Sequence, residues 1–180
     1  MTCNLFLIGP PGVGKTTIGR QLAKKLGLLF YDADHEIELR TGVPIATIFE
    51  IEGEAGFRKR EQAMIDQLSQ SRNIVLSLGG GAILSENNRL VLQARGVVIY
   101  LYASLETQLA RIRQRKGTRP LLNTLNPKEI LTQLNTIRQP LYQSIANHSY
   151  NTDADTPMEI AKQILALLPL PISTTGGGCR

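Results

Sequence analysis

Tryptophan is absent from this sequence, cysteine occurs twice in 180 residues, and aromatic side chains make up only 5%. The two cysteines, Cys3 and Cys179, lie at opposite ends, which argues against a disulfide framework or metal cluster and fits a reducing, cytoplasmic location. No apolar run reaches the roughly 20 residues of a membrane span, so we expect no membrane association. With 42% hydrophobic residues, the chain can form one globular domain with a sizeable core.

Acidic side chains are missing from one strongly charged stretch, 111–119. The five positive charges of this stretch equal the formal net charge of the whole chain, +5. They belong to Arg111, Arg113, Arg115, Lys116 and Arg119. A surface that binds nucleic acid more often spreads its charge and interleaves aromatic residues. We therefore expect a local anionic ligand at this stretch and no nucleic-acid partner.

Strand-like and helix-like patterns alternate along the chain, which predicts an α/β fold with three α/β/α layers around a central, parallel, five-stranded sheet. The expected strands are 4–8, 28–31, 73–78, 97–102 and 149–152. The expected helices are 15–26, two within 45–69 separated by a turn near Gly53, 85–95, one that Ser104 caps, 126–147 and 157–168.

A glycine-rich segment joins the first expected strand to the first expected helix. It reads Gly9-Pro10-Pro11-Gly12-Val13-Gly14-Lys15-Thr16 and matches G-x-x-x-x-G-K-T, which indicates a phosphate-binding loop. Its backbone N–H groups and the helix dipole would hold phosphate oxygens, with Lys15 at the β- and γ-phosphates. A plain glycine-rich turn is the alternative, which the strand–helix context disfavours. The expected nucleotide contacts are Gly12, Val13, Gly14, Lys15, Thr16 and Thr17.

A kinase of this class needs to exclude water from the bound triphosphate. The basic stretch is typical of a lid that would do so, with a solvated charged loop as the alternative. We expect a single P-loop kinase domain over 1–168, a mobile basic lid at about 112–125 and a disordered tail at 169–180.

Many phosphate-loop proteins hold their metal through an aspartate after a second apolar strand. Here the strand Ile74-Val75-Leu76 runs into Ser77-Leu78-Gly79-Gly80-Gly81, with no aspartate. The carboxylate must come from elsewhere, and Asp32 and Asp34 follow the second strand at the same sheet edge. A solvated turn and helix cap is the alternative for this pair. The chain also lacks the guanine-reading pattern N-K-x-D, which disfavours a GTPase.

Several motifs, in order along the chain, together resemble shikimate kinase. They are the phosphate loop, Asp32-Ala33-Asp34, Phe57-Arg58-Lys59-Arg60-Glu61, Gly79-Gly80-Gly81, Arg119-Pro120-Leu121-Leu122 and Arg138-Gln139-Pro140-Leu141-Tyr142. The resemblance runs from residue 4 to about 168. It implies transfer of the ATP γ-phosphoryl group to the 3-hydroxyl of shikimate, in the pathway to chorismate and aromatic amino acids.

On the acceptor side, the resemblance implies that Asp34 binds the hydroxyls and that Arg58 and Arg138 hold the carboxylate. It further implies that Glu61 orients Arg58, which three-residue spacing on a helix permits. The remaining residues implied to line this side are Gly79, Gly80, Gly81, Phe49 and Phe57. For the two phenylalanines, plain core packing is an equally good interpretation.

On the nucleotide side, the resemblance implies that Lys15, Asp34 and Arg119 carry catalysis, with Arg119 closing over the phosphates from the lid. Thr16 and Asp32 would hold Mg²⁺. Arg111 would stack on the adenine. The loop Asp153-Ala154-Asp155-Thr156-Pro157 lacks the arginine that some relatives carry there, so backbone contacts near Asp155 would replace it.

Two other functions stay open at this point. The chain could be another P-loop small-molecule kinase, such as a gluconate kinase, although gluconate has no ring for phenylalanines to flank. It could also bind nucleotide without turnover, although the paired acceptor-side arginines argue against this. We expect a monomer that acts on ATP and shikimate.

Overall fold

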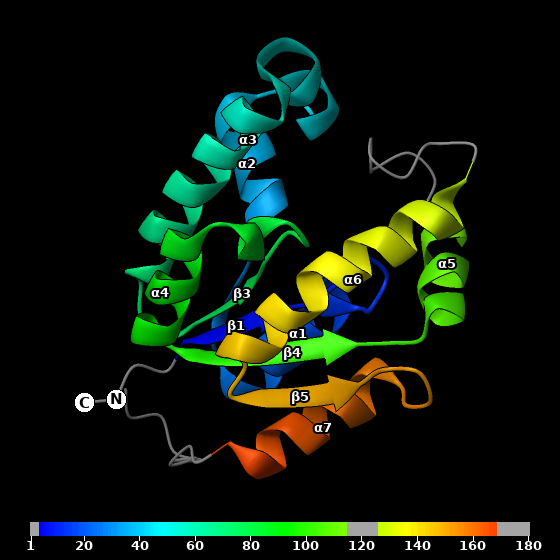
Figure 1. The fold of residues 1–180 in the computed structure, drawn as a ribbon. Coiled ribbons are helices and arrows are strands. Elements are labelled where there is room, and N and C mark those ends of the chain that lie inside the picture. The colour runs from blue at the N-terminus through cyan, green and yellow to red at the C-terminus, as the bar shows by residue number, and fades with distance from the viewer. Residues whose placement is uncertain (1–3, 115–125, 169–180) are drawn as a thin grey trace.

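The structure, a computed structural model, describes residues 4–114 and 126–168. Its strands are β1 Leu5–Ile8, β2 Leu29–Asp32, β3 Ile74–Ser77, β4 Val97–Tyr102 and β5 His148–Asn151 (Figure 1). Its helices are α1 Lys15–Leu26, α2 Ala33–Thr41, α3 Ile45–Ser69, α4 Glu86–Arg95, α5 Leu105–Gln114, α6 Pro127–Ile145 and α7 Pro157–Leu167, with the 3-10 helix η1 at Ala82–Leu84. The predicted tail, and the predicted lid from 115 onward, lie outside the described residues.

The five strands form one parallel sheet in the order β2-β3-β1-β4-β5, which confirms the predicted architecture. β1 lies in the middle and all of its residues are buried. From β1 the chain moves to one side of the sheet for β2 and β3, and then to the other side for β4 and β5. Ligands of open α/β sheets bind at such a switch point, beyond the carboxyl ends of the strands.

Helices cover both faces of the sheet, as the alternating pattern predicts. Leu5 and Leu7 of β1 face the core that α1 and α7 complete. Phe6 and Ile8 face the opposite core, which α2, α3, α4 and α6 complete. Figure 1 shows α3 and α6 on opposite sides of the segment that follows β3. These two helices therefore supply the walls around the carboxyl end of the sheet.

Three local details differ from the sequence-based expectation. The sequence predicted neither α2 nor η1. α2 gives little signal, because it buries only Ala33 and Ile37 and has little helical periodicity. α6 ends at Ile145 and not at 147. Asn147 is drawn to the sheet, where its backbone N–H donates to the Val98 carbonyl and its side chain accepts from the Val98 N–H.

The predicted turn within 45–69 is present as a single non-helical residue. Gly53 has φ 69° and ψ −177° inside α3, so the helix changes direction there. The conformation favours glycine because φ is positive. Within the described part of the chain, none of the helices combines the length and the apolar character needed to cross a membrane.

Packing between α1 and the sheet gives a first testable prediction. Gly19 is buried, and a Cβ added there would lie 2.6 Å from Phe30 Cε2 and 2.9 Å from Leu7 Cδ1. Alanine stabilises a helix by about 1 kcal/mol relative to glycine, but overpacking destabilises the folded protein by about 1–3 kcal/mol. We expect Gly19→Ala to lower the free energy of unfolding by roughly 1–2 kcal/mol in urea titrations.

The matched control is Lys24→Ala, on the exposed face of the same helix. It should change the free energy of unfolding by less than about 0.5 kcal/mol. A Gly19→Ala protein as stable as the original would contradict the prediction, because the cost of moving Phe30 aside would then be no larger than the gain in helix propensity.

Candidate active site

The phosphate loop, Gly9–Thr16, follows β1 at the switch point of the sheet. Gly9, Gly12 and Gly14 have positive φ angles of 142°, 82° and 95°, a region that favours glycine. A Cβ at Gly12 would also lie 2.8 Å from the backbone oxygen of Gln108 on α5. Glycine is therefore required here both for the path of the backbone and for the close approach of α5.

No side chain caps the start of helix α1. Gly14 at the N-cap provides no side-chain hydrogen bond, and the first turn holds no acidic residue. The first N–H groups of the helix and the positive end of its dipole can therefore serve an anion. Lys15 is buried, and its Nζ donates to the carbonyl oxygens of Gly9 at 2.7 Å and Pro10 at 2.9 Å. The ammonium group is held over the loop.

Thr16 and Asp32 meet beside the loop, where the sequence predicted a metal. Thr16 Oγ1 donates to Asp32 Oδ2 at 2.7 Å. Asp32 occupies the N-cap position of α2, but its side chain makes no capping hydrogen bond. The helix-cap alternative therefore fails for this carboxylate. A hydroxyl and a carboxylate fit Mg²⁺, which usually takes its other ligands from phosphates and water.

One cleft joins the phosphate loop to α3 and α6. Lys15, Thr16 and Asp32 line it from the phosphate-loop side of the sheet, together with Arg58 of α3 and Arg138 of α6. The remaining lining residues are Pro11, Asp34, Ile45, Phe49, Phe57, Glu61, Ser77, Leu78, Gly79, Gly80, Gly81 and Leu134. The structure thus brings the predicted phosphate, metal and acceptor residues into one cleft.

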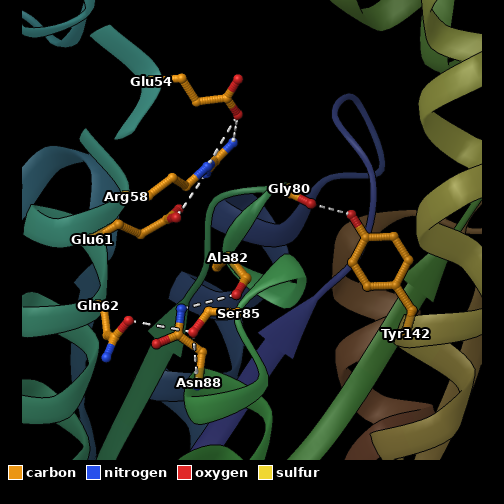
Figure 2. Close-up of polar contacts among 9 residues, drawn as sticks. All are labelled: Glu54, Arg58, Glu61, Gln62, Gly80, Ala82, Ser85, Asn88 and Tyr142. Atoms are coloured by element: carbon orange, nitrogen blue, oxygen red, sulfur yellow. Dashed lines mark hydrogen bonds and ion pairs between the residues drawn. The ribbon is translucent and has the colours of Figure 1, made fainter. Parts of the chain in front are cut away.

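Arg58 on α3 lies between two glutamates (Figure 2). Its Nη1 donates to Glu61 Oε2 at 2.7 Å, which confirms the predicted contact. Its Nη2 and Nε donate to Glu54 Oε1 at 3.0 and 3.3 Å. Burial lowers the pKa of Arg58, but Glu61 and Glu54 together raise it above its ordinary value. The guanidinium is therefore charged and held in place before any ligand binds.

The three glycines after β3 each face a different side chain of the cleft. A Cβ at Gly79 would lie 2.8 Å from both Asp34 Oδ1 and Glu61 Oε1. A Cβ at Gly81 would overlap the guanidinium of Arg58. The glycines therefore allow charged side chains to approach the backbone closely.

Glu61 is a carboxyl group held in an unusual environment. It is 1% exposed, and its Oε1 has no hydrogen-bond partner among the described residues. Burial raises the pKa of Glu61 to about 7, while Arg58 opposes this rise and the charge of Asp34 adds to it. Near neutral pH this group therefore exists in both protonation states.

Arg138 and the two phenylalanines complete the acceptor end. Arg138 on α6 is only 6% exposed and lines the cleft, where its guanidinium lies close to Gly80. Phe49 and Phe57 have ring centroids 4.8 Å apart and line the same cleft. Phe57 also belongs to the hydrophobic core, so its core-packing interpretation holds.

Arg111 ties together three segments near the expected adenine site. Its Nη2 donates to the Thr152 carbonyl at 2.6 Å, and its Nη1 donates to Thr152 Oγ1 at 3.0 Å and to the Gly12 carbonyl at 3.4 Å. Asp155 lies in the connection after β5, where its carboxylate accepts a hydrogen bond from Gln163 at 2.8 Å. Arg111 thus connects α5, the phosphate loop and the segment after β5.

Arg119, the predicted lid arginine, lies outside the described residues. Sequence reasoning missed two contacts at the site. Glu54 precedes Arg58 by four residues on α3, so the helical spacing that identified Glu61 could have identified it too. The contact of Thr152 with Arg111 carries no sequence signal, because 41 positions separate the two residues.

A phosphate loop at the switch point of a parallel sheet, with charged acceptor residues across the same cleft, defines a P-loop small-molecule kinase. The family model for shikimate kinase matches residues 11–169. A shikimate kinase of Coxiella burnetii (strain Dugway 5J108-111) is 55% identical over 163 residues, which cover 90% of this chain and 91% of the relative. One of Vibrio parahaemolyticus is 50% identical over 165 residues, covering 92% and 95%.

The solved structures agree with this result. Shikimate kinase from Acinetobacter baumannii, in complex with shikimate, superposes with a TM-score of 0.89 at 46% identity, covering 93% of each chain. The chain belongs to the shikimate kinase family. It is an ATP-dependent small-molecule kinase.

The buried Glu61 predicts how stability depends on pH. Its pKa is about 7 in the folded protein against an ordinary value of 4.5, so the folded state binds this proton more tightly. Raising the pH from 4.5 to 7 therefore favours unfolding through this group, by up to about 3 kcal/mol. We expect the free energy of unfolding to fall over this range, and Glu61→Gln to lack that component.

Parallel urea titrations at pH 5 and 8 measure the effect. Asp66→Asn on the same helix is the control, because Asp66 is half-exposed and pairs with Arg95 at the surface. Equal pH dependence in the original protein and in Glu61→Gln would contradict the prediction.

Proposed function

We propose that the protein transfers the γ-phosphoryl group of ATP to the 3-hydroxyl of shikimate, with Mg²⁺, giving shikimate 3-phosphate and ADP. The observation that carries the proposal is that Lys15 of the phosphate loop, Arg58 and Arg138 line one and the same cleft. Family membership supports it, and the related Acinetobacter baumannii enzyme has been solved with shikimate bound.

Shikimate is a small ring with one carboxylate and three hydroxyl groups, and the cleft offers a partner for each kind of group. Arg58 and Arg138 approach from two helices, and a planar guanidinium can hold a carboxylate through parallel hydrogen bonds. Asp34 follows β2 near the phosphate loop. In our proposal its carboxylate accepts hydrogen bonds from the ring hydroxyls and orients one toward the γ-phosphate.

Phosphoryl transfer has a loose transition state, so positioning and charge contribute most of the catalysis. Lys15 leaves the carbonyls of Gly9 and Pro10 and bonds the β- and γ-phosphate oxygens. Thr16 and Asp32 would hold Mg²⁺, which would supply positive charge to offset that of the phosphates. Arg119 adds positive charge to the transferring group, as the resemblance implies. Arg111 and the segment around Asp155 hold the adenine.

A coupled assay of ADP release from Mg-ATP, with and without shikimate, tests the proposal. We expect shikimate-dependent ADP release that a chelator of Mg²⁺ abolishes. Lys15→Ala should lose turnover while its circular dichroism spectrum stays that of the original, because the charge is lost and the fold is not. Release of ADP that is independent of shikimate, or that gluconate stimulates equally, would refute the assigned substrate.

Arg58→Ala separates the acceptor end from the nucleotide end. Charge-assisted hydrogen bonds contribute about 1.5–3 kcal/mol, so the KM for shikimate should rise roughly 10- to 100-fold. The KM for ATP should stay within about twofold, since the hydrogen-bond partners of Arg58 are Glu54 and Glu61 on its own helix.

Arg60→Ala is the matched control for this variant. Arg60 lies two residues away on α3 but pairs with Glu52 at the surface, at 2.6 Å. It should leave both KM values unchanged. Parallel increases in both KM values for Arg58→Ala would count against its role in acceptor binding.

A further inference from the structure

Tyr142 on α6 reaches the glycine segment from the side opposite Arg58. Its side chain is 1% exposed. Its hydroxyl donates to the carbonyl oxygen of Gly80 at 2.5 Å (Figure 2). Its ring is stacked on Tyr100 of β4, with centroids 5.1 Å apart and planes at 17°. The stacking fixes the ring, and the ring fixes the position of the hydroxyl.

The backbone from Gly79 to Leu84 has its carbonyl groups held one after another. The turn itself supplies two donors, because the Ala82 N–H bonds Gly79 and the Leu84 N–H bonds Gly81, both at 3.1 Å. Helix α4 supplies the next donors. The Asn88 side chain donates to the Ala82 carbonyl at 2.9 Å, and the Arg89 side chain donates to the Ile83 carbonyl at 2.8 Å. The Gly80 carbonyl differs, because its donor comes from α6 across the cleft.

The same hydroxyl lies beside a proposed acceptor residue. Arg138 and Tyr142 are four residues apart on α6 and therefore lie on one face of the helix. A Cβ at Gly80 would lie 3.5 Å from both Arg138 Nη1 and Tyr142 Oη. Burial raises the pKa of Tyr142 far above its ordinary value, although Arg138 opposes this through its charge and a hydrogen bond. The hydroxyl is therefore protonated, and it donates to Gly80 beside the Arg138 guanidinium.

We propose that Tyr142 is a positioning residue for acceptor binding, whose hydroxyl fixes the Gly80 peptide and the Arg138 guanidinium relative to each other. The inference deepens the proposed function and rests on it. Gly80 and Arg138 belong to segments separated by more than fifty positions, and this hydroxyl bonds Gly80 from the helix that carries Arg138. Without it, the Gly80 carbonyl loses its donor, and the hydrogen bond that joins the glycine segment to α6 beside Arg138 is lost.

A purely structural role makes a different prediction. If Tyr142 only filled the core, phenylalanine would serve as well, because it keeps the ring and the stacking on Tyr100. Any loss of stability would then affect shikimate and ATP alike. The proposed role requires the hydroxyl itself and concerns only the acceptor end.

The test compares Tyr142→Phe with Tyr100→Phe, which removes a hydroxyl from the other ring of the same stacked pair. Steady-state assays give kcat and both KM values, calorimetry gives the Kd for shikimate, and thermal melting verifies that each variant folds. We expect Tyr142→Phe to raise the KM and Kd for shikimate roughly 3- to 10-fold, since a lost hydrogen bond has about this effect. The KM for ATP should stay within about twofold, and Tyr100→Phe should match the original protein.

Each outcome decides between the possibilities. Unchanged shikimate constants in a folded Tyr142→Phe, or equal changes for shikimate and ATP, would overturn the positioning role and leave the proposed function intact. An original protein without shikimate-dependent ADP release would instead overturn the proposed function, and the inference with it. Equal increases from both tyrosine variants would assign the effect to the stacked pair and also overturn the proposal.

Discussion

β3 hydrogen-bonds to β1 on one side and to β2 on the other, and the register of these pairings sets the site. Asp32 at the end of β2 lies level with Ser77 at the end of β3, and Ser77 lies level with Leu7 of β1. Three neighbouring strands therefore end together, and the chain leaves them as the phosphate loop, the turn into α2 and the glycine segment. A shift of one residue in β3 would turn its buried side chains to the wrong face. The register is thus held by the two cores, and the cleft depends on it.

Several charged side chains of the cleft are buried and therefore lose contact with water. Asp34 and Glu61 both approach Gly79, and Arg58 is placed over Gly81. The raised pKa of Glu61 shows that Arg58 does not fully compensate for burial of this carboxyl group. The hydroxyl groups of an acceptor could donate to these carboxylates, and its carboxylate could accept from Arg58. Strain of this kind is common where a site is built for a ligand and not for stability.

The sequence predicted the sheet, the helices on both faces and the phosphate loop, because each has a local signal. The Arg58 and Glu61 pair was predicted for the same reason, since helical spacing alone brings these residues together. α2 was missed because tertiary contacts at Ala33 and Ile37 stabilise a segment with little periodicity of its own. The contacts of Tyr142 with Gly80 and of Arg111 with Thr152 could not be predicted. They join distant positions through single polar groups, and neither hydrophobic periodicity nor capping encodes such pairs.

The cationic side chains of the cleft are already held by the protein's own groups. Lys15 bonds the carbonyls of Gly9 and Pro10, and Arg58 bonds Glu61 and Glu54. Binding of a phosphate or a carboxylate therefore exchanges one set of hydrogen bonds for another and does not order a free side chain. Exchange limits the gain in affinity, since the broken bonds offset the new ones. It also means that little reorganisation remains for the transition state, where preorganised charge contributes most to the rate. A cleft built in this way favours turnover over tight binding of either substrate.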